Sequence, residues 1–509
     1  MEDYNDLIQQ RFKKLAEISA SGIKPYAGRF PVSASSQDLA DRYGSVAKED
    51  LERDKVTVTL AGRIIALRSF GKACFAHIQD GSGRIQLYFQ KNTLGDERFE
   101  LFRKLDIGDF IGVKGFLFRT RTNELTADIE EFTLLAKSLR PLPEKWHGLT
   151  DVELRYRQRY VDLIVNPEVK KVFILRTRII QAIRSFLNAR GFLEVETPMM
   201  QGIPGGATAR PFRTHHNALG MDLFLRIAPE LYLKRLLVGG FERVYEINRN
   251  FRNEGISTRH NPEITMLEFY WAYADYRDLI GLTEEMIGTV ASEVLGTTEV
   301  LCEGQAISLA PPWKKLTFLD SLREAGVPDE VIADPARARE HAKRLGAALK
   351  GGEPHGKVLN ELFETLVEPK LMQPTFITDY PTDISPLSKK RDDDPNFVER
   401  FELFVMGREM ANAFSELNDP VDQKARFLKQ VNEREAGDEE AHQMDEDFIR
   451  ALEYGMPPAA GEGIGIDRLV MLLTGSPSIR DVILFPLMRP EVRSGESSPE
   501  PAAPAVPQE

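Results

Sequence analysis

Apolar and polar residues alternate along residues 55–136, and this alternation predicts a series of short β-strands. Val56, Val58 and Leu60 alternate with polar neighbours, which is the period of a half-buried strand. Further strands are expected over 74–79, 85–90, 109–119 and 124–136. The first two of these flank Asp80-Gly81-Ser82-Gly83, a sequence typical of a hairpin turn. Five strands within about 80 residues predict a five-stranded OB-fold β-barrel.

Beyond residue 165 the apolar residues recur at the spacing of a helix. Asn166-Pro167-Glu168 is a typical helix start with Asn166 as the N-cap, and apolar residues then recur about every 3.6 positions as far as Phe186. We expect this helix to end at Gly191 and a strand to follow, closed by Pro198. Further strands are expected over 241–250, 264–273, 375–379, 400–406 and 409–414, and 315–370 is mainly helical. This mixture predicts an α+β domain.

These changes of pattern divide the chain into five expected parts. They are an N-terminal helical extension (1–54), the barrel (55–140), a linker (141–165), the α+β domain (166–490, with a helical insertion at about 315–370) and a disordered tail (491–509). No apolar stretch approaches the roughly 18 residues that span a bilayer, and the acidic N-terminus lacks a signal-peptide core. Cys74 and Cys302 lack metal-ligand spacing. We therefore expect a cytoplasmic protein with buried thiols and no membrane partner.

The charge of the chain is unevenly distributed. The formal net charge is −12, yet residues 1–150 hold 23 Lys and Arg against 21 Asp and Glu. Within 55–91 there are six basic residues and one acidic residue. Such a patch suits the phosphates of a nucleic acid, although ordinary solvated strand charges would give the same count.

Two segments of the α+β domain gather residues suited to a nucleotide. The first is Phe251-Arg252-Asn253-Glu254 followed by His260-Asn261-Pro262-Glu263, around the turn of a predicted hairpin. The second is 461–468, where glycines at 461, 463 and 465 let a backbone approach a ligand and Arg468 ends the run. These segments resemble motifs 2 and 3 of the class II aminoacyl-tRNA synthetases, and 166–198 resembles motif 1. With Arg-Glu-Met-Ala-Asn-Ala-Phe-Ser-Glu-Leu-Asn at 408–418, the chain is identified as resembling the bacterial-type, lysine-specific subfamily.

Other motifs fit less well. The segment 351–357 nearly matches a phosphate-binding P-loop, but Val358 stands where the Mg²⁺-binding hydroxyl is needed. In 461–466 an isoleucine replaces the third glycine of a dinucleotide fingerprint. His215 and His216 have no third metal ligand nearby in sequence, so a structural or substrate-side role is expected.

The chemistry implied by the resemblance is amino-acid activation. The carboxylate of the amino acid attacks the α-phosphorus of ATP, and because this nucleophile is already ionised, catalysis consists mainly of positioning and charge neutralisation. A lysine pocket must also offset the desolvation of an ammonium group, so it needs carboxylates. The resemblance implies an antiparallel sheet flanked by helices, lysyl-adenylate formation with Mg²⁺, transfer to the 3′-end of tRNA(Lys), and a homodimer formed through motif 1.

The resemblance also implies a role for individual residues. The expected catalytic residues are Arg252 and Arg468. The expected ATP-binding residues are Arg252, Glu254, His260, Asn261, Ile264, Glu402, Glu409 and Arg468, of which Glu402 and Glu409 bind the metal. The expected lysine-binding residues are Gly206, Glu230, Arg252, Glu268, Tyr270, Asn412, Phe414 and Glu416. The expected anticodon-binding residues of the barrel are Phe75, Gln86 and Arg68.

Two positions depart from the family pattern, and other functions stay open. Ile264 replaces the aromatic residue that usually sandwiches adenine against the motif 3 arginine, and Glu462 stands where related chains often carry an apolar residue. The same scaffold could activate aspartate or asparagine, although these would need cations at the side chain. Transfer of lysine to a protein, or a catalytically inactive RNA-binding protein, are the remaining alternatives.

Overall fold

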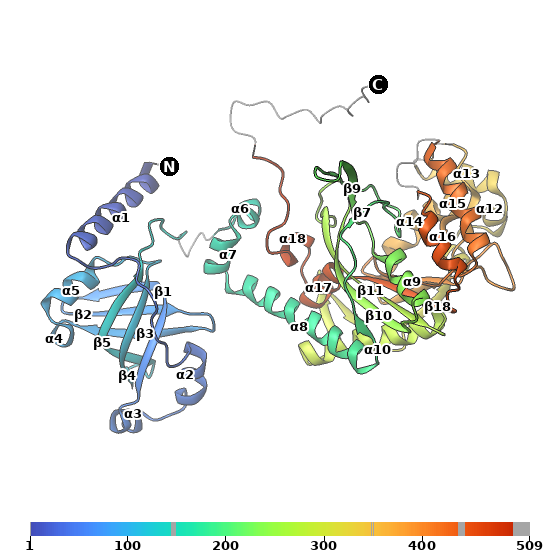
Figure 1. The fold of residues 1–509 in the computed structure, drawn as a ribbon. Coiled ribbons are helices and arrows are strands. Elements are labelled where there is room, and N and C mark those ends of the chain that lie inside the picture. The colour runs from blue at the N-terminus through green and yellow to red at the C-terminus, as the bar shows by residue number, and fades with distance from the viewer. Residues whose placement is uncertain (1, 144–148, 348, 350, 436–442, 492–509) are drawn as a thin grey trace. The chain divides into compact units, whose positions relative to one another are not determined.

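The chain forms two compact units, residues 1–150 and 151–509 (Figure 1). The computed structural model describes all residues except 1, 144–148, 348, 350, 436–442 and 492–509. The expected disordered tail therefore lies, from residue 492, outside the described residues. No helix in the described part of the chain is long and apolar enough to cross a membrane.

The first unit contains a closed five-stranded barrel, which confirms the predicted OB-fold. Its strands pair in the order β1-β2-β3-β5-β4, and β4 returns to β1. They are β1 (Thr57–Phe70), β2 (Ala73–Gln79), β3 (Arg84–Gln90), β4 (Phe110–Arg119) and β5 (Leu125–Ala136). At the predicted β2–β3 turn, the Asp80 carboxylate accepts hydrogen bonds from the backbone N–H groups of Ser82 and Gly83. Alternate residues such as Ala76, Ile78 and Leu87 fill the barrel core.

Helices precede and interrupt this barrel. Three helices precede it: α1 (Glu2–Ala20), α2 (Ser36–Tyr43) and α3 (Lys48–Asp54). Between β3 and β4 lie α4 (Lys91–Leu94) and α5 (Asp96–Arg103). Phe99 and Phe102 of α5 join the barrel core.

The second unit is built on an eight-stranded, mostly antiparallel sheet, as the resemblance implied. Its order is β14-β15-β16-β17-β18-β11-β10-β6. Only the outermost pairs, β14–β15 and β6–β10, are parallel. In this order the strands are β14 (Lys314–Thr317), β15 (Thr375–Thr378), β16 (Arg400–Val405), β17 (Arg408–Ser415), β18 (Ala459–Gly465), β11 (Glu263–Ala272), β10 (Arg243–Phe251) and β6 (Leu193–Glu194). Two smaller sheets are β7 (Met200–Gln201) with β8 (Arg213–His216) and β9 (Met221–Leu225), and β12 (Glu299–Cys302) with β13 (Gln305–Ser308).

Three helices bury one face of the large sheet: α8 (Pro167–Ala189), α10 (Tyr276–Leu295) and α17 (Ile466–Thr474). The predicted motif 1 helix is present as α8, and Ile179, Ile183 and Phe186 lie in this core. Asn166 is its N-cap residue but makes no side-chain cap. Its amide nitrogen instead donates to the Asp162 carboxylate, on the preceding helix, at 2.6 Å. The predicted strand after Gly191 is reduced to the two residues of β6.

The other helices form two peripheral clusters and a connection. The predicted insertion contains α11 (Phe318–Glu324), α12 (Asp329–Ala333), α13 (Pro335–Arg344) and α14 (His355–Leu366), which share one apolar cluster. A second cluster joins α9 (Glu230–Val238), α15 (Pro420–Glu435) and α16 (Glu446–Glu453). The range expected as a linker holds α6 (Val152–Arg157) and α7 (Arg159–Val165). The remaining helix, α18 (Ile479–Val482), follows α17.

Candidate active site

The face of the large sheet opposite α8, α10 and α17 is the floor of the candidate site. Along β11, Leu267 and Phe269 enter the core on the helix side. Successive strand residues point to opposite faces, so Glu268 and Tyr270 point the other way. Residues paired across neighbouring strands point to the same face. Because Gly463 of β18 is paired with both Glu268 and Asn412, all three residues face the same side. The register therefore aligns the predicted residues of motifs 2 and 3 on one face.

The glycines of β18 serve different purposes. A Cβ on Gly461 would lie 2.3 Å from both Glu416 Oε1 and Tyr270 Cε1, so this glycine makes room for neighbouring side chains. A Cβ on Gly463 would meet only Met266 and Glu268, at 3.4 and 3.7 Å. A ligand therefore has room to approach the backbone at Gly463, whereas neighbouring side chains fill the space next to Gly461.

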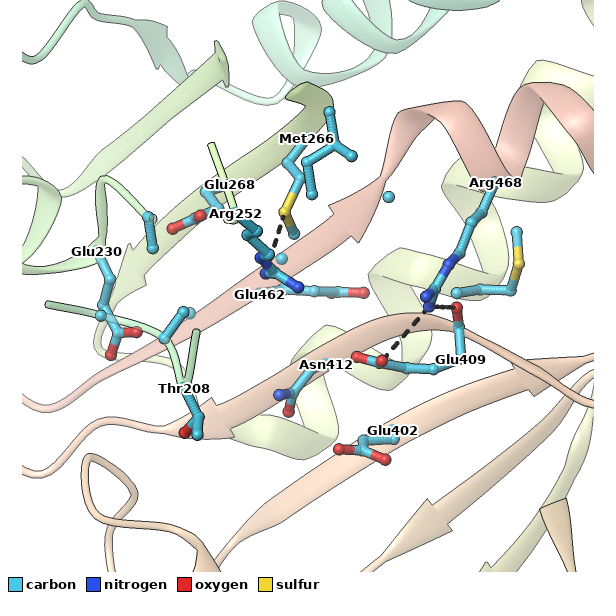
Figure 2. Close-up of a pocket in the computed structure, with 18 of the residues that line it drawn as sticks. Thr208, Glu230, Arg252, Met266, Glu268, Glu402, Glu409, Asn412, Glu462 and Arg468 are labelled. Carbon is cyan, nitrogen blue, oxygen red and sulfur yellow. Dashed lines mark hydrogen bonds and ion pairs between the residues drawn. The ribbon is translucent and has the colours of Figure 1, made fainter. Parts of the chain in front are cut away.

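A cavity of about 560 Å³ lies over this floor. Every site residue predicted in the second unit lines it except Glu416, which is buried behind Gly461 and Tyr270. Figure 2 shows side chains from β11, β16, β17, α9 and α17 around this one space, with Arg252 and Arg468 pointing into it. The tertiary structure thus brings together residues that lie up to 262 positions apart, from Gly206 to Arg468.

Arg252 follows the last residue of β10, at the start of the motif 2 loop. Its backbone N–H donates to the Pro262 carbonyl at 2.8 Å, which closes the loop. The guanidinium contacts the Met266 sulfur at 3.9 Å and forms no ion pair with any residue that the structure describes (Figure 2). Its charge is therefore available to an anion in the cavity.

Arg468 and His260 lie at the other end of the cavity. Arg468 donates to the Glu409 backbone carbonyl at 2.6 Å and pairs with the Glu409 carboxylate at 3.4 Å. Burial and the positive charge of Arg468 lower the pKa of His260, which the Glu254 carboxylate partly opposes. The neutral imidazole is therefore favoured at pH 7.

The carboxylates expected to hold a metal face the same space. Glu402 lies across from Asn412, and Glu409 is near it on the paired strand. Glu402 accepts from Tyr380 at 2.9 Å and pairs with Arg400 at 2.5 Å. Burial and the neighbouring Glu409 raise the pKa of Glu402, which Arg400 opposes.

This pair of carboxylates suits a magnesium ion whose remaining ligands are waters and phosphate oxygens. Within the described residues no three His, Cys, Asp or Glu side chains are close enough to hold a metal by themselves. Mg²⁺ is commonly held by one or two carboxylates, with waters and substrate phosphates completing its shell. A cation would also relieve the repulsion that raises the pKa of Glu402.

The opposite end of the cavity is acidic and deeply buried. Glu230 and Glu268 are 6% and 5% exposed. Burial and the neighbouring Glu230 raise the pKa of Glu268 well above its ordinary value. The same surroundings raise the pKa of Tyr270. Gly206 has φ +86°, and a Cβ there would lie 2.8 Å from the Cβ of Glu230, so only glycine fits against this wall.

Glu462, one of the two departures from the family pattern, lies on the helix side of β18. It alternates with the cavity-facing glycines and points to the helix side, where the Thr283 hydroxyl of α10 contacts both carboxylate oxygens at 2.7–2.8 Å. Burial raises the pKa of Glu462 to about 8. The side chain is therefore a neutral hydrogen-bonding group inside an apolar core at pH 7.

In the barrel, the predicted anticodon residues lie on the outer surface. Phe75 faces away from the core residues Cys74 and Ala76, and its ring lies 4.7 Å from that of Tyr88. Gln86 donates to Glu124 at 3.0 Å. Arg68 is exposed and lies opposite Phe75.

The aromatic surface of the barrel is larger than the sequence interpretation suggested. The rings of Phe70, Phe75, Tyr88 and Phe118 form a row with centroid separations of 4.7–6.3 Å. Simple alternation accounts for Phe75 and Tyr88, which lie between core residues of β2 and β3. Phe70 has the parity of the core residues Val58 and Leu60, and it faces outward because the register of β1 shifts between Ile64 and Ala66.

Comparisons with known proteins identify the family of both units. A family model described as tRNA synthetases class II (D, K and N) matches residues 151–489, and one described as OB-fold nucleic acid binding domain matches 58–142. The chain belongs to the class II tRNA synthetases. It is 62% identical to a Lysine–tRNA ligase of Pelotomaculum thermopropionicum over 96% of each chain. Similar matches are 61% to one of Carboxydothermus hydrogenoformans (96% of this chain, 99% of that one) and 55% to one of Bacillus subtilis (96% and 98%).

Three residues of this synthetase site were missed by the sequence interpretation. Met266 continues the alternation of Ile264 and Glu268, and Arg400 precedes Glu402 by two positions, so strand parity alone could have identified both. Arg400 donates to the Asn412 side chain at 3.1 Å as well as pairing with Glu402. Lys234 gave no such signal, because its position in the middle of α9 resembles that of a surface lysine.

Proposed function

We propose that this synthetase is a lysine–tRNA ligase. It activates L-lysine with ATP to lysyl-adenylate and transfers the lysyl group to the 3′-end of tRNA(Lys). The observation that supports the proposal is that one cavity offers opposite charges to the two kinds of group in lysine. Arg252 forms no ion pair in the described structure, and it lines the same cavity as the buried Glu230, Glu268 and Tyr270. The names of the full-length relatives support the same substrate.

Each end of the cavity has a distinct task in this mechanism. Arg252 binds the lysine carboxylate and the α-phosphate together, so that two anions that must react can approach. Asn412 holds the same carboxylate, Phe414 flanks the aliphatic stem, and the carboxylates of the acidic end receive the ammonium groups. Arg468 stacks on the adenine, opposite Ile264. His260 reaches the outer phosphates, and Glu254 and Asn261 help to hold the nucleotide.

Glu402 and Glu409 are the proposed ligands of Mg²⁺. When bound, the ion neutralises charge that builds up on the phosphates as pyrophosphate leaves. Arg400 and Tyr380 orient the Glu402 carboxylate through their hydrogen bonds, which favours one geometry of the site.

The remaining assignments follow from the two units and their surfaces. The barrel at 55–140 binds the anticodon through Phe75, Gln86 and Arg68, and the domain at 166–490 carries catalysis. We infer a homodimer because α8 and the following segment expose apolar Ile174, Leu193 and Met200 (43–57% exposed). A cytoplasmic location follows from a role in translation.

The test is amino-acid-dependent ATP–pyrophosphate exchange without tRNA. Lysine, aspartate, asparagine, arginine and ornithine are compared, and exchange with lysine far above the others is expected. Exchange with aspartate or asparagine would show that the pocket residues are misassigned on a correct scaffold. Absence of exchange with all five would favour the inactive RNA-binding alternative.

A further inference from the structure

Lys234 is a cation buried in the acidic wall of the candidate lysine pocket. Its side chain, in the second turn of α9, is 0% exposed. The ammonium pairs with Glu230 at 2.6 Å and with Glu416, and lies 5.4 Å from the centre of the Phe414 ring. Lys234 does not line the cavity, so it lies behind the residues that would touch a substrate.

The acidic groups around Lys234 outnumber its single positive charge. Glu230, Glu268 and Glu416 can carry three negative charges, and Lys234 supplies one positive charge. In the empty pocket burial raises the pKa of all three carboxyls, so their full ionisation is unfavourable until cations enter the cluster. A lysine substrate brings two ammonium groups, while its carboxylate has Arg252. The cluster and an amino acid with a second amine are therefore matched in charge.

We propose that Lys234 is a positioning residue that sets the amino-acid specificity of this pocket. Its ammonium fixes the Glu230 and Glu416 carboxylates in place and leaves the two negative charges that an amino acid with a second amine neutralises. This inference rests on the proposed lysine specificity, because it matches the charge of Glu230, Glu268 and Glu416 to the two amines, with Glu416 acting from behind Gly461 and Tyr270. It adds a residue that touches the carboxylates and not the substrate.

The electrostatics of the surrounding elements agree with this role. Burial opposes the charge on Lys234, but Glu230 and Glu416 raise its pKa nonetheless. Burial raises the pKa of Glu230 and of Glu416, and Lys234 acts against the rise in both. The other ionisable groups facing this cluster are Tyr270 and Glu268 from β11 and Arg400 from β16. Glu268 is also influenced by Arg252 and by Glu246 of β10, which is paired with Arg226. Without Lys234, the two carboxyls would keep their protons to higher pH.

The test compares Lys234→Met with Lys137→Met. Lys137, in the barrel, is also fully buried and bridges two carboxylates, Asp106 and Asp109. ATP–pyrophosphate exchange is measured without tRNA, and the concentrations of lysine and of ATP are varied in separate series to obtain the KM for each. Because loss of one partner of a buried pair is strongly unfavourable, Lys234→Met should raise the KM for lysine about 100-fold at pH 7. The KM for ATP should stay within about threefold, and Lys137→Met should change neither KM.

The pH dependence separates positioning from a structural role. Between pH 7 and 9 the KM for lysine should fall more steeply in Lys234→Met than in the parent protein, in which the pKa of Glu416 is already raised to about 8, since without Lys234 the carboxyls ionise only at higher pH. Lys234→Arg, which keeps the charge, should recover part of the lost affinity. Should Lys234→Met fail to fold, Lys234→Gln gives the same comparison.

Each result has a defined meaning. A KM for lysine within threefold of the parent value, or equal rises for lysine and ATP without the steeper pH dependence, would overturn the role of Lys234. Absence of lysine-dependent exchange in the parent protein would refute the proposed function instead.

Discussion

Replacing Glu462 with glutamine should remove a large pH dependence from the stability of the catalytic unit. The Glu462 carboxyl is 2% exposed and touches only the Thr283 hydroxyl among its hydrogen-bonding neighbours in the described structure. That hydroxyl also lies 2.7 Å from the Leu279 carbonyl. Thr283 has one proton to donate, so a neutral carboxyl that donates to Thr283 satisfies all three groups. A glutamine amide can do the same.

The size of the effect follows from the pKa. Burial raises the pKa of Glu462 from 4.5 to about 8. Below pH 4.5 the carboxyl is neutral in both folded and unfolded states. Between pH 4.5 and 8 the unfolded chain loses the proton that the folded chain keeps, so stability falls as pH rises, by about 1.4 kcal/mol per pH unit. Between pH 5.5 and 7.5 the loss comes to about 2 to 3 kcal/mol.

Urea unfolding at these two pH values, followed by far-UV circular dichroism, measures this effect. From pH 5.5 to pH 7.5, the free energy of unfolding of Glu462→Gln should increase by about 2 to 3 kcal/mol relative to that of the parent protein, since glutamine does not titrate. Glu293→Gln, the same substitution at an exposed position of α10, is the control and should show no such gain. A stability difference between Glu462→Gln and the parent protein that is equal at both pH values would refute the argument.

Three further predictions concern ligand binding. Ile264→Phe restores a π-face opposite Arg468, worth about 0.5–1.5 kcal/mol, and should lower the KM for ATP about two- to tenfold; an unchanged or higher value would contradict it. Glu402→Gln and Glu409→Gln should each raise the Mg²⁺ concentration for half-maximal exchange at least about tenfold, and an unaltered Mg²⁺ titration would remove the residue from the metal site. Phe75→Ala removes a stacking surface worth about 1–3 kcal/mol and should raise the KM for tRNA in aminoacylation about tenfold; an equal KM would assign Phe75 to the barrel alone.

The local features of both units were predictable because they depend on neighbouring residues. Strand alternation gave the five barrel strands, and the strands predicted over 241–250 and 264–273 match β10 and β11 within a few residues, whereas β18 was not predicted as a strand. Parity within a strand also determines which residues share a face, so Glu268 and Tyr270 could be grouped before the fold was known. The end of a helix was less predictable: Asn166 has the residue type of a cap, but the Asp162 carboxylate accepts a hydrogen bond from its side chain.

The sequence by itself determined a barrel followed by an α+β domain, the strand and helix periods and the residue types of a nucleotide and amino-acid site, because these depend on patterns within short segments. Only the tertiary structure decided which side chains of neighbouring strands lie on the same face of the sheet. The pairing of β18 with β11 and β17 turns Glu462 into the core and Gly463 toward the cavity. It was likewise the packing of α9 against the sheet that brought Lys234 to Glu416, 182 positions away, because a buried charge is held by whichever partner the fold brings within reach.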